Sequence, residues 1–181
     1  MRLELSPNPL TPRDATRSIA VEVERLGPEA IALRYQLVGE LAALVVPAVA
    51  APGRADELWR HTCFEAFLRP DADEGYCEFN FAPSTQWAAY RFTGYREGMA
   101  PAPVAPPRID VRAGDGVLLL TAKLNLAGLD LCSGASRLAL SAVVEEASGA
   151  KSYWALAHPP GKPDFHHRSS FACTLAGQEG S

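Results

Sequence analysis

The chain has 181 residues, enough for one domain with a core that folds without a disulfide or a metal. Its 17 basic and 21 acidic residues give a net charge of −4, and it has no basic face or polybasic run, which argues against nucleic acid or a membrane surface as partner. The N-terminus lacks an apolar segment typical of a signal peptide, and the most apolar run (41–51) is interrupted by Pro47, so we expect a cytoplasmic protein.

The cysteines provide no framework for folding or for metal binding. No CxxC pair and no secretory signal accompany them, so we expect reduced and mostly buried thiols at Cys63, Cys77, Cys132 and Cys173. Structural zinc sites usually pair their ligands closely in sequence, and we therefore expect no metal site.

Alternation of apolar and polar residues with a period of two predicts short strands along the whole chain. Residues 41–49 fit a strand or an irregular apolar loop, 94–107 are a long loop rich in glycine and proline, and 126–134 are less regular, with a helical turn. The predicted strands are residues 3–5, 18–26, 30–38, 62–68, 76–81, 86–92, 108–112, 117–125, 137–146, 152–157 and 171–175. About ten short strands without a long helical pattern predict a single all-β domain over residues 1–181, an antiparallel β-sandwich.

The stretch 59–92 places polar side chains inside strand-like sequence. Residues two apart on a strand share a face, so the apolar residues of 76–81 point to the core. The opposite face carries Tyr76, Glu78 and Asn80, and Glu65 lies beside them if its strand pairs with theirs as a hairpin. This face is either a solvated outer surface or a concave surface for a ligand.

Large aromatic residues among these polar groups favour the ligand-binding interpretation. Trp59, Tyr76 and Trp87 lie close to the carboxylates and the amide in sequence. An exposed indole can stack on the CH groups of a sugar ring while the polar groups accept its hydroxyls, and an exposed aromatic residue loses hydrophobic burial if it has no function. Taken alone, Trp87 is more typical of a core residue.

A second polar segment, HPPGKPDFHHRSSF at residues 158–171, is expected to lie next to this face. Lys162, Asp164 and His166 are its candidate ligand-binding residues. Adjacent histidines on an extended chain point in opposite directions, and no HxH or HExxH spacing occurs, so His166 and His167 are not expected to bind one metal ion. The alternative role of Asp164 and the imidazoles is to hold this proline-rich loop in place by hydrogen bonds.

Three segments resemble the DOMON-like proteins of the family 9 carbohydrate-binding-module superfamily. They are LWRHTCFEAFL (58–68), YCEFNFAPSTQWAAY (76–90) and PDFHHRSSF (163–171), and the similarity spans about two-thirds of the chain. The resemblance implies a two-sheet, immunoglobulin-like β-sandwich of about nine to eleven strands. It also implies binding of sugars or haem rather than catalysis.

The resemblance assigns roles to individual positions. Trp59 resembles the first stacking tryptophan of the family, and Glu65 resembles the acidic residue that receives sugar hydroxyls. Glu78 and Asn80 match positions at which sugar-binding members carry a basic residue and an amide, so Glu78 departs from the pattern. The second stacking tryptophan has no clear counterpart, and Phe165 or His166 lies in that region.

The sequence therefore predicts a non-catalytic module that binds a carbohydrate or a similar small polar ligand. The predicted ligand-binding residues are Trp59, His61, Glu65, Tyr76, Glu78, Asn80, Trp87, Lys162, Asp164 and His166.

Three alternatives stay open. A haem-binding domain would take its axial ligand from Met99 or from His61, His158, His166 or His167. An enzyme would use Glu65, Glu78 and His166 as acid–base groups. An interaction protein, including a homodimer, would dock another chain through an exposed sheet edge or an aromatic face.

Overall fold

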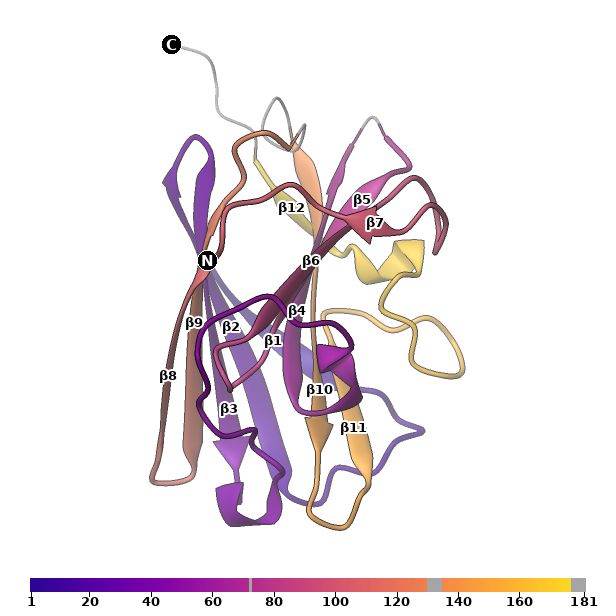
Figure 1. Ribbon diagram of the computed structural model, residues 1–181. Coiled ribbons are helices and arrows are strands. Elements are labelled where there is room, and N and C mark those ends of the chain that lie inside the picture. The colour runs from indigo at the N-terminus through magenta and orange to yellow at the C-terminus, as the bar shows by residue number, and fades with distance from the viewer. Residues whose placement is uncertain (72, 130–134, 177–181) are drawn as a thin grey trace.

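The computed structural model describes residues 1–71, 73–129 and 135–176, and this part of the chain forms twelve strands with antiparallel pairing (Figure 1). The strands are β1 (Arg2–Pro7), β2 (Thr16–Gly27), β3 (Ala30–Gly39), β4 (Cys63–Pro70), β5 (Tyr76–Phe81), β6 (Trp87–Phe92), β7 (Ala100–Pro101), β8 (Arg108–Gly114), β9 (Val117–Asn125), β10 (Ser136–Glu145), β11 (Lys151–Ala155) and β12 (Cys173–Leu175). Their order is β7-β6-β5-β4-β10-β11-β1-β2-β3-β9-β8, with β12 on β10. Three single-turn 3₁₀ helices, η1 (Leu41–Ala43), η2 (Leu58–Arg60) and η3 (Arg168–Ser170), complete the elements.

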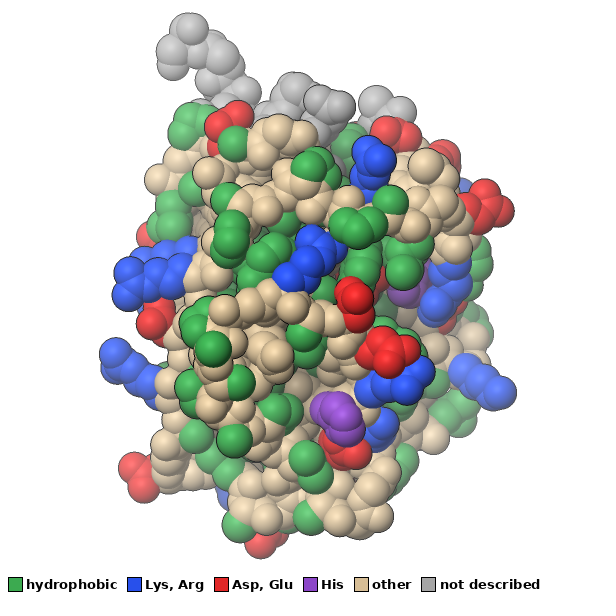
Figure 2. Space-filling view, viewed as in Figure 1, with side chains coloured by type: hydrophobic (Ala, Val, Ile, Leu, Met, Phe, Trp, Pro, Cys, Tyr) green, Lys and Arg blue, Asp and Glu red, His purple; other side chains and the backbone are tan. Residues whose placement is uncertain are grey.

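Strand β1 links two sheets, which pack on each other as the predicted β-sandwich. Its first residues pair with β2, and its last two, Ser6 and Pro7, pair with β11. One sheet is therefore β1-β2-β3-β9-β8, and the other contains β4 to β7 with β10, β11 and β12. Figure 1 shows the two sheets facing each other with the N-terminal strand between them. In Figure 2, acidic and basic side chains lie interspersed over this view of the molecule.

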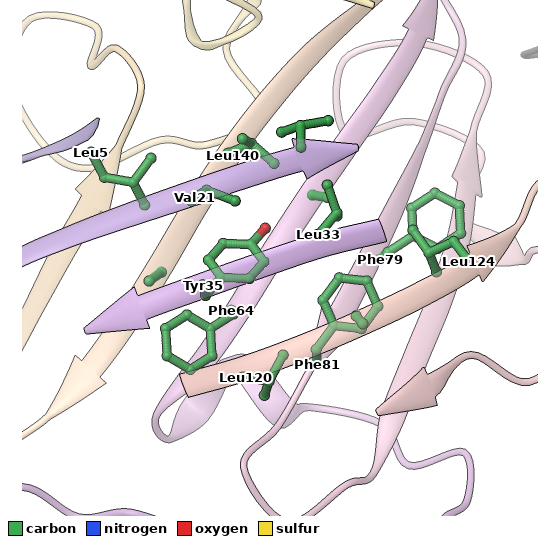
Figure 3. Close-up of a cluster of buried hydrophobic side chains, with 14 of the residues drawn as sticks. Leu5, Val21, Leu33, Tyr35, Phe64, Phe79, Phe81, Leu120, Leu124 and Leu140 are labelled. Atoms are coloured by element: carbon green, nitrogen blue, oxygen red, sulfur yellow. The ribbon is translucent and has the colours of Figure 1, made fainter. Parts of the chain in front are cut away.

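The main core lies between the two sheets (Figure 3). Tyr35 on β3 packs against Phe64 on β4, with ring centroids 5.0 Å apart. The Tyr35 hydroxyl donates a hydrogen bond of 2.7 Å to the main-chain carbonyl of Glu65, so a polar contact also joins the sheets inside the core. Phe79 and Phe81 on β5 enter the same core, which confirms the core face predicted for this strand.

A second, smaller apolar cluster lies on the other face of β4, β5 and β6. It contains Phe67, Tyr76 and Phe92 from the strands and Phe165 and Phe171 from the loop between β11 and β12, here called the C-terminal loop (156–172). Because this loop covers the sheet, every residue of β5 is buried. The polar face of β5 is therefore not a solvated outer surface.

Substituting Tyr35 by phenylalanine tests the polar contact between the sheets. The change leaves the buried Glu65 carbonyl without this donor, so we expect the free energy of unfolding to fall by about 1–2 kcal/mol. Urea denaturation monitored by circular dichroism measures the change. Tyr153→Phe is the matched control, because no hydrogen bond of its hydroxyl occurs within the described ranges. Equal stability of the Tyr35 variant and the parent protein would contradict the expectation.

Most of the predicted strands are confirmed, and the differences lie between them. Residues 41–49 form η1 and irregular chain with an isolated bridge at Leu44, and the predicted long loop contains the short strand β7.

Within the described residues, Cys63 and Cys77 are buried and Cys173 is partly exposed, all three as free thiols. Cys132 and the segment 130–134 lie outside the described residues. No helix of the described chain is long and apolar enough to cross a membrane.

Candidate functional site

A pocket of about 800 Å³ opens on the polar face of β4 and β5. The strands form its floor, η2 and the chain before it form one wall, and the β6–β7 loop (93–99) and the C-terminal loop form the others. The polar groups of its lining are Asp56, Glu57, Glu65, Glu78, Arg96 and His166, and its aromatic residues are Trp59, Tyr90, Phe92, Tyr153 and Phe165.

Two carboxyl groups occupy the floor of the pocket. Glu65 faces Asn80 and Phe67 faces Glu78 in the β4–β5 register, so the two glutamates are diagonal neighbours on adjacent strands. Glu65 is only 3% exposed and Glu78 only 6%. Neighbouring side chains on the sheet donate one hydrogen bond to each: Ser141 Oγ to Glu65 Oε2 at 3.3 Å, and Asn80 Nδ2 to Glu78 Oε1 at 2.7 Å.

Burial makes both carboxyl groups harder to ionise. Desolvation raises the pKa of Glu65 well above its usual range, and the negative charge of Glu78 raises it further. Desolvation also raises the pKa of Glu78, while the hydrogen bond from Asn80 and the charge of Arg96 oppose this. In both floor carboxyl groups, burial favours the protonated form more than it is favoured in exposed glutamates.

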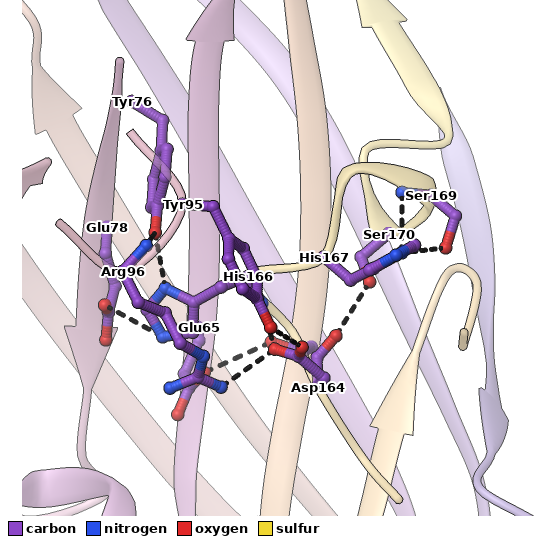
Figure 4. A network of polar contacts seen from close by, with 11 residues as sticks. Glu65, Tyr76, Glu78, Tyr95, Arg96, Asp164, His166, His167, Ser169 and Ser170 are labelled. Carbon is purple, nitrogen blue, oxygen red and sulfur yellow. Dashed lines mark hydrogen bonds and ion pairs between the residues drawn. The ribbon is translucent and has the colours of Figure 1, made fainter. Parts of the chain in front are cut away.

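Arg96 is the only arginine or lysine that lines the pocket within the described residues. It lies in a turn closed by two main-chain hydrogen bonds, from Thr93 N–H to the Glu97 carbonyl and from Glu97 N–H to the Gly94 carbonyl, and has a left-handed φ of 57°. Its main-chain N–H donates to Tyr76 Oη at 3.2 Å, and its Nη2 donates to Asp164 Oδ1 at 2.8 Å. Figure 4 shows this side chain extending beside the glutamates toward Asp164. The β6–β7 loop and the C-terminal loop are therefore joined across the pocket by one ion pair.

His166 connects the floor to the apolar cluster. Its Nδ1 lies 2.7 Å from Tyr76 Oη, and its Nε2 lies 3.7 Å from Glu78 Oε2 (Figure 4). Its ring meets those of Phe67 and Phe92 edge-on at 5.2 Å. Burial lowers the pKa of His166 to about 4, with a further decrease from Arg96 and an opposing effect of Asp164. At neutral pH the ring is uncharged, so its contact with Glu78 is a polar contact rather than an ion pair.

Aromatic side chains line the pocket around the polar floor. Trp59 on η2 is 48% exposed and lines the pocket, with the Arg60 guanidinium 5.5 Å from its ring. Tyr90 on β6 donates a hydrogen bond of 2.6 Å to Asp56 Oδ1, which fixes the phenol ring against the wall. The pocket therefore combines a polar, buried floor with a partly exposed indole.

The structure brings only some of the predicted site residues into the pocket. Trp59, Glu65, Glu78 and His166 line it together. A further three form hydrogen bonds with residues of the lining without lining the pocket themselves: Tyr76 contacts His166, Asn80 contacts Glu78, and Asp164 contacts Arg96.

The other three predicted residues lie elsewhere. Trp87 pairs with Phe81 across β5 and β6, is 6% exposed and packs in the main core, so its assignment as a ligand platform is corrected. Lys162 is exposed and does not line the pocket. His61 points to Glu145, with Nδ1 2.7 Å from Oε2, and also lies outside the pocket lining.

Arg96 and Tyr90 were not anticipated from the sequence. Tyr90 follows Trp87 by three positions on the same strand, so the two side chains lie on opposite faces of the sheet. Once Trp87 is assigned to the core, Tyr90 is placed on the pocket side. Arg96 lies in a loop that meets β5 and the C-terminal loop only in the folded chain. Its one local signal is the Gly94–Gly98 turn that follows a strand.

The pocket does not fit haem, which the family resemblance allows. Its two carboxyl groups form the floor, and both ring nitrogens of His166 already face side-chain oxygens. The other candidate ligand in the lining, Met99, is 63% exposed. Within the described residues, no group of three or more His, Cys, Asp or Glu side chains is arranged to hold a metal ion.

The fold is similar to those of carbohydrate-binding proteins. No family model and no curated protein matches the sequence. A candidate carbohydrate-binding protein from Bacteroides uniformis matches with a TM-score of 0.70 and 15% identity, over 98% of this chain and 86% of that chain. A family 9 carbohydrate-binding module from Caldicellulosiruptor kristjanssonii, solved in complex with glucose, matches with a TM-score of 0.53 and 10% identity over the same shares of the two chains. The chain shares the fold of these proteins. The more specific resemblance to DOMON-like proteins stays a prediction.

Proposed function

We propose that the protein is a non-catalytic module that binds a carbohydrate, or a similar small polar ligand, in the pocket on β4 and β5. The observation that carries the proposal is the placement of Trp59 in the same pocket as the buried polar floor of Glu65 and Glu78. A volume of about 800 Å³ is within the range of small-molecule sites. The glucose complex of the family 9 module, a protein of the same fold, adds support at the level of ligand class.

The pocket offers the two kinds of contact that a sugar needs. The half-exposed indole of Trp59 presents a flat apolar surface to the CH groups of a pyranose, and Tyr90 lines the same pocket. Glu65 and Glu78 can accept hydrogen bonds from hydroxyl groups, and Arg96 can donate to hydroxyl or ring oxygens. Because the polar groups are already held by neighbours, little side-chain entropy is lost when a ligand binds.

Isothermal titration calorimetry against a panel of neutral, amino and acidic mono- and oligosaccharides tests the proposal, with tryptophan fluorescence as a second readout. A saturable heat from at least one sugar, together with a change in tryptophan emission, is the expected result. Absence of both signals for every sugar at millimolar concentration would contradict it.

Substituting Trp59 by alanine is expected to weaken binding of that sugar by about 1–2 kcal/mol, or roughly 5- to 30-fold, because the stacking surface is lost. The fold should be retained, since the indole is 48% exposed and belongs to neither apolar cluster. Trp59→Phe keeps a flat ring and should retain most of the affinity. An alanine variant that binds as tightly as the parent protein would show that the ligand does not stack on Trp59.

A second candidate function is acid–base catalysis on a bound glycoside, favoured by the paired carboxyl groups with raised pKa values in the pocket. Incubation of the protein with aryl glycosides and with the sugars that bind, followed by assay of released phenol and reducing ends, separates the two functions. Binding without turnover supports the module, whereas turnover that is lost on Glu65→Gln and Glu78→Gln supports the enzyme.

A further inference from the structure

A second hollow, of about 330 Å³, lies on the other side of His166 and Tyr76 from the ligand pocket. Arg69, Glu74, Tyr95, His167, Arg168 and Phe171 line it. We propose that this hollow, here called the arginine pocket, binds an oxyanion such as a carboxylate, sulfate or phosphate group through Arg69 and Arg168. The proposal is independent of the ligand class of the first pocket.

Arg69 is the central residue of the arginine pocket. It lies near the end of β4, directly opposite Arg137 on β10, and two like charges in this position repel each other. Arg137 is neutralised by Asp71, whose Oδ1 lies 2.9 Å from Arg137 Nε. No such carboxylate serves Arg69 in the described part of the chain. Its guanidinium carbon instead lies 5.3 Å from the centre of the Phe171 ring.

One donor of Arg69 is buried without an acceptor. Its Nε is shielded from solvent and makes no hydrogen bond to any described residue. Because this Nε–H is shielded from solvent, a ligand in the hollow would bind the outer, Nη end of the Arg69 guanidinium. The two Nη groups of an arginine carry paired N–H donors that match two oxygens of a carboxylate, sulfate or phosphate group.

Two further donors face the same hollow. Arg168, on η3, is exposed and makes no ion pair within the described ranges. His167 Nδ1 accepts a hydrogen bond of 3.2 Å from the main-chain N–H of Ser169, so Nε2 is the ring nitrogen that can donate to a ligand.

The charges around the hollow favour an anion. Glu74 is the one carboxylate in its lining; it is exposed and pairs with neither arginine. Asp164, the nearest acidic residue of the C-terminal loop, is held by Arg96 and by the Tyr95 hydroxyl (Figure 4). Two arginines against one exposed glutamate leave a net positive site, which Tyr95 and Phe171 also line.

The experiment is a titration of the ¹⁵N-labelled full chain, followed through the Arg69 Nε–H and His167 ring resonances at constant ionic strength. Sodium sulfate and phosphate represent a free anion, glucuronate and glucose 6-phosphate represent an anionic group on a sugar, and sodium chloride and glucose are the controls. We expect saturable shifts with the oxyanions and none with chloride or glucose. Tighter binding of the sugar-linked anions than of sulfate and phosphate would assign the anion to the ligand itself, and the reverse order would assign a free anion.

Variants separate the site from general charge effects. Arg69→Gln should weaken oxyanion binding at least tenfold, and Arg168→Ala should weaken it several-fold, whereas Arg112→Ala, an exposed arginine on β8, should leave it unchanged. The Trp59→Ala variant should bind sulfate like the parent protein, so failure of sugar binding and failure of anion binding are distinguishable. If no oxyanion produces saturable shifts at Arg69 and His167, the arginine pocket is not an anion site. The same conclusion follows if Arg69→Gln changes the oxyanion affinity no more than Arg112→Ala does.

Discussion

Replacing Arg96 by alanine is expected to weaken sugar binding by about 2–3 kcal/mol, or roughly 30- to 150-fold. Arg96 is the only arginine or lysine among the described residues that line the ligand pocket. Its Nη2 donates a hydrogen bond of 2.8 Å to Asp164 Oδ1, which holds the side chain in place. Without it, a sugar oxygen loses a charged donor. The partly buried Asp164 also loses its cation, and of the side-chain bonds from the β6–β7 loop to Asp164 only the hydrogen bond from Tyr95 is left.

Two variants control for this effect. Arg96→Lys keeps the charge but not the planar fork, and we expect it to recover part of the lost affinity. Arg91→Ala removes an exposed arginine from the neighbouring strand β6 and should bind like the parent protein. Calorimetry with the tightest sugar of the panel measures all three variants. An Arg96→Ala variant with the affinity of the parent protein would mean that Arg96 only holds the loops together.

The strands that carry the floor were predictable because both of their faces are specified by the sequence. The alternation in 76–81 gives an apolar face that enters the main core and a polar face that carries Glu78 and Asn80. The same alternation in β4 places Glu65 beside them. Local periodicity was sufficient here because a hairpin fixes which residues of two adjacent strands are neighbours.

The rest of the pocket depends on contacts between segments that are distant in sequence. Asp164 meets Arg96 across 68 residues, and His166 meets Tyr76 across 90. Neither loop has a periodic pattern that fixes where its side chains point. Trp87 shows the opposite error. Its position close to polar residues in the sequence suggested a ligand platform, whereas its pairing with Phe81 places it in the core. Loop residues and strand register together therefore limit what the sequence alone could predict.

Replacing Glu65 by glutamine is expected to stabilise the protein at neutral and alkaline pH by about 1–3 kcal/mol, because the buried carboxylate of the parent protein carries a desolvation cost. Glu65 is 3% exposed, has Glu78 as its neighbour, and has a pKa raised well above its usual range mainly by burial. The amide has the same shape, can still accept the hydrogen bond from Ser141, and carries no charge that must be buried. For a chain of this length, each kcal/mol corresponds to about 2–4 °C in melting temperature.

Glu65 and His166 make the stability of the folded state depend on pH in opposite directions. A carboxyl group whose pKa is higher in the folded than in the unfolded state binds its proton more tightly when folded. Its contribution to stability is therefore fully present below the unfolded value near 4.5 and is lost as the pH rises through the folded value. His166, whose pKa is lowered from 6.5 to about 4, acts in the opposite sense and destabilises the folded state as the pH falls through this range. Glu65→Gln removes only the first of these contributions.

Urea denaturation of the parent protein and of Glu65→Gln between pH 4 and pH 9 measures both contributions. The advantage of the variant should grow with pH and disappear near pH 4, while the loss of stability on acidification that His166 causes should appear in both proteins. Glu29→Gln, at an exposed glutamate in the β2–β3 turn, should behave like the parent protein throughout. Identical pH profiles for Glu65→Gln and the parent protein would contradict the raised pKa.

The same variant also distinguishes binding from catalysis. Glutamine retains an acceptor oxygen at the floor, so a binding module should lose less than about tenfold in affinity for a neutral sugar. An enzyme that uses Glu65 as an acid or base would instead lose turnover by a factor of about 10² or more while still binding its substrate. A stabilised variant that still binds sugar would therefore show that Glu65 is retained at the expense of stability, and the turnover assay would show for which function.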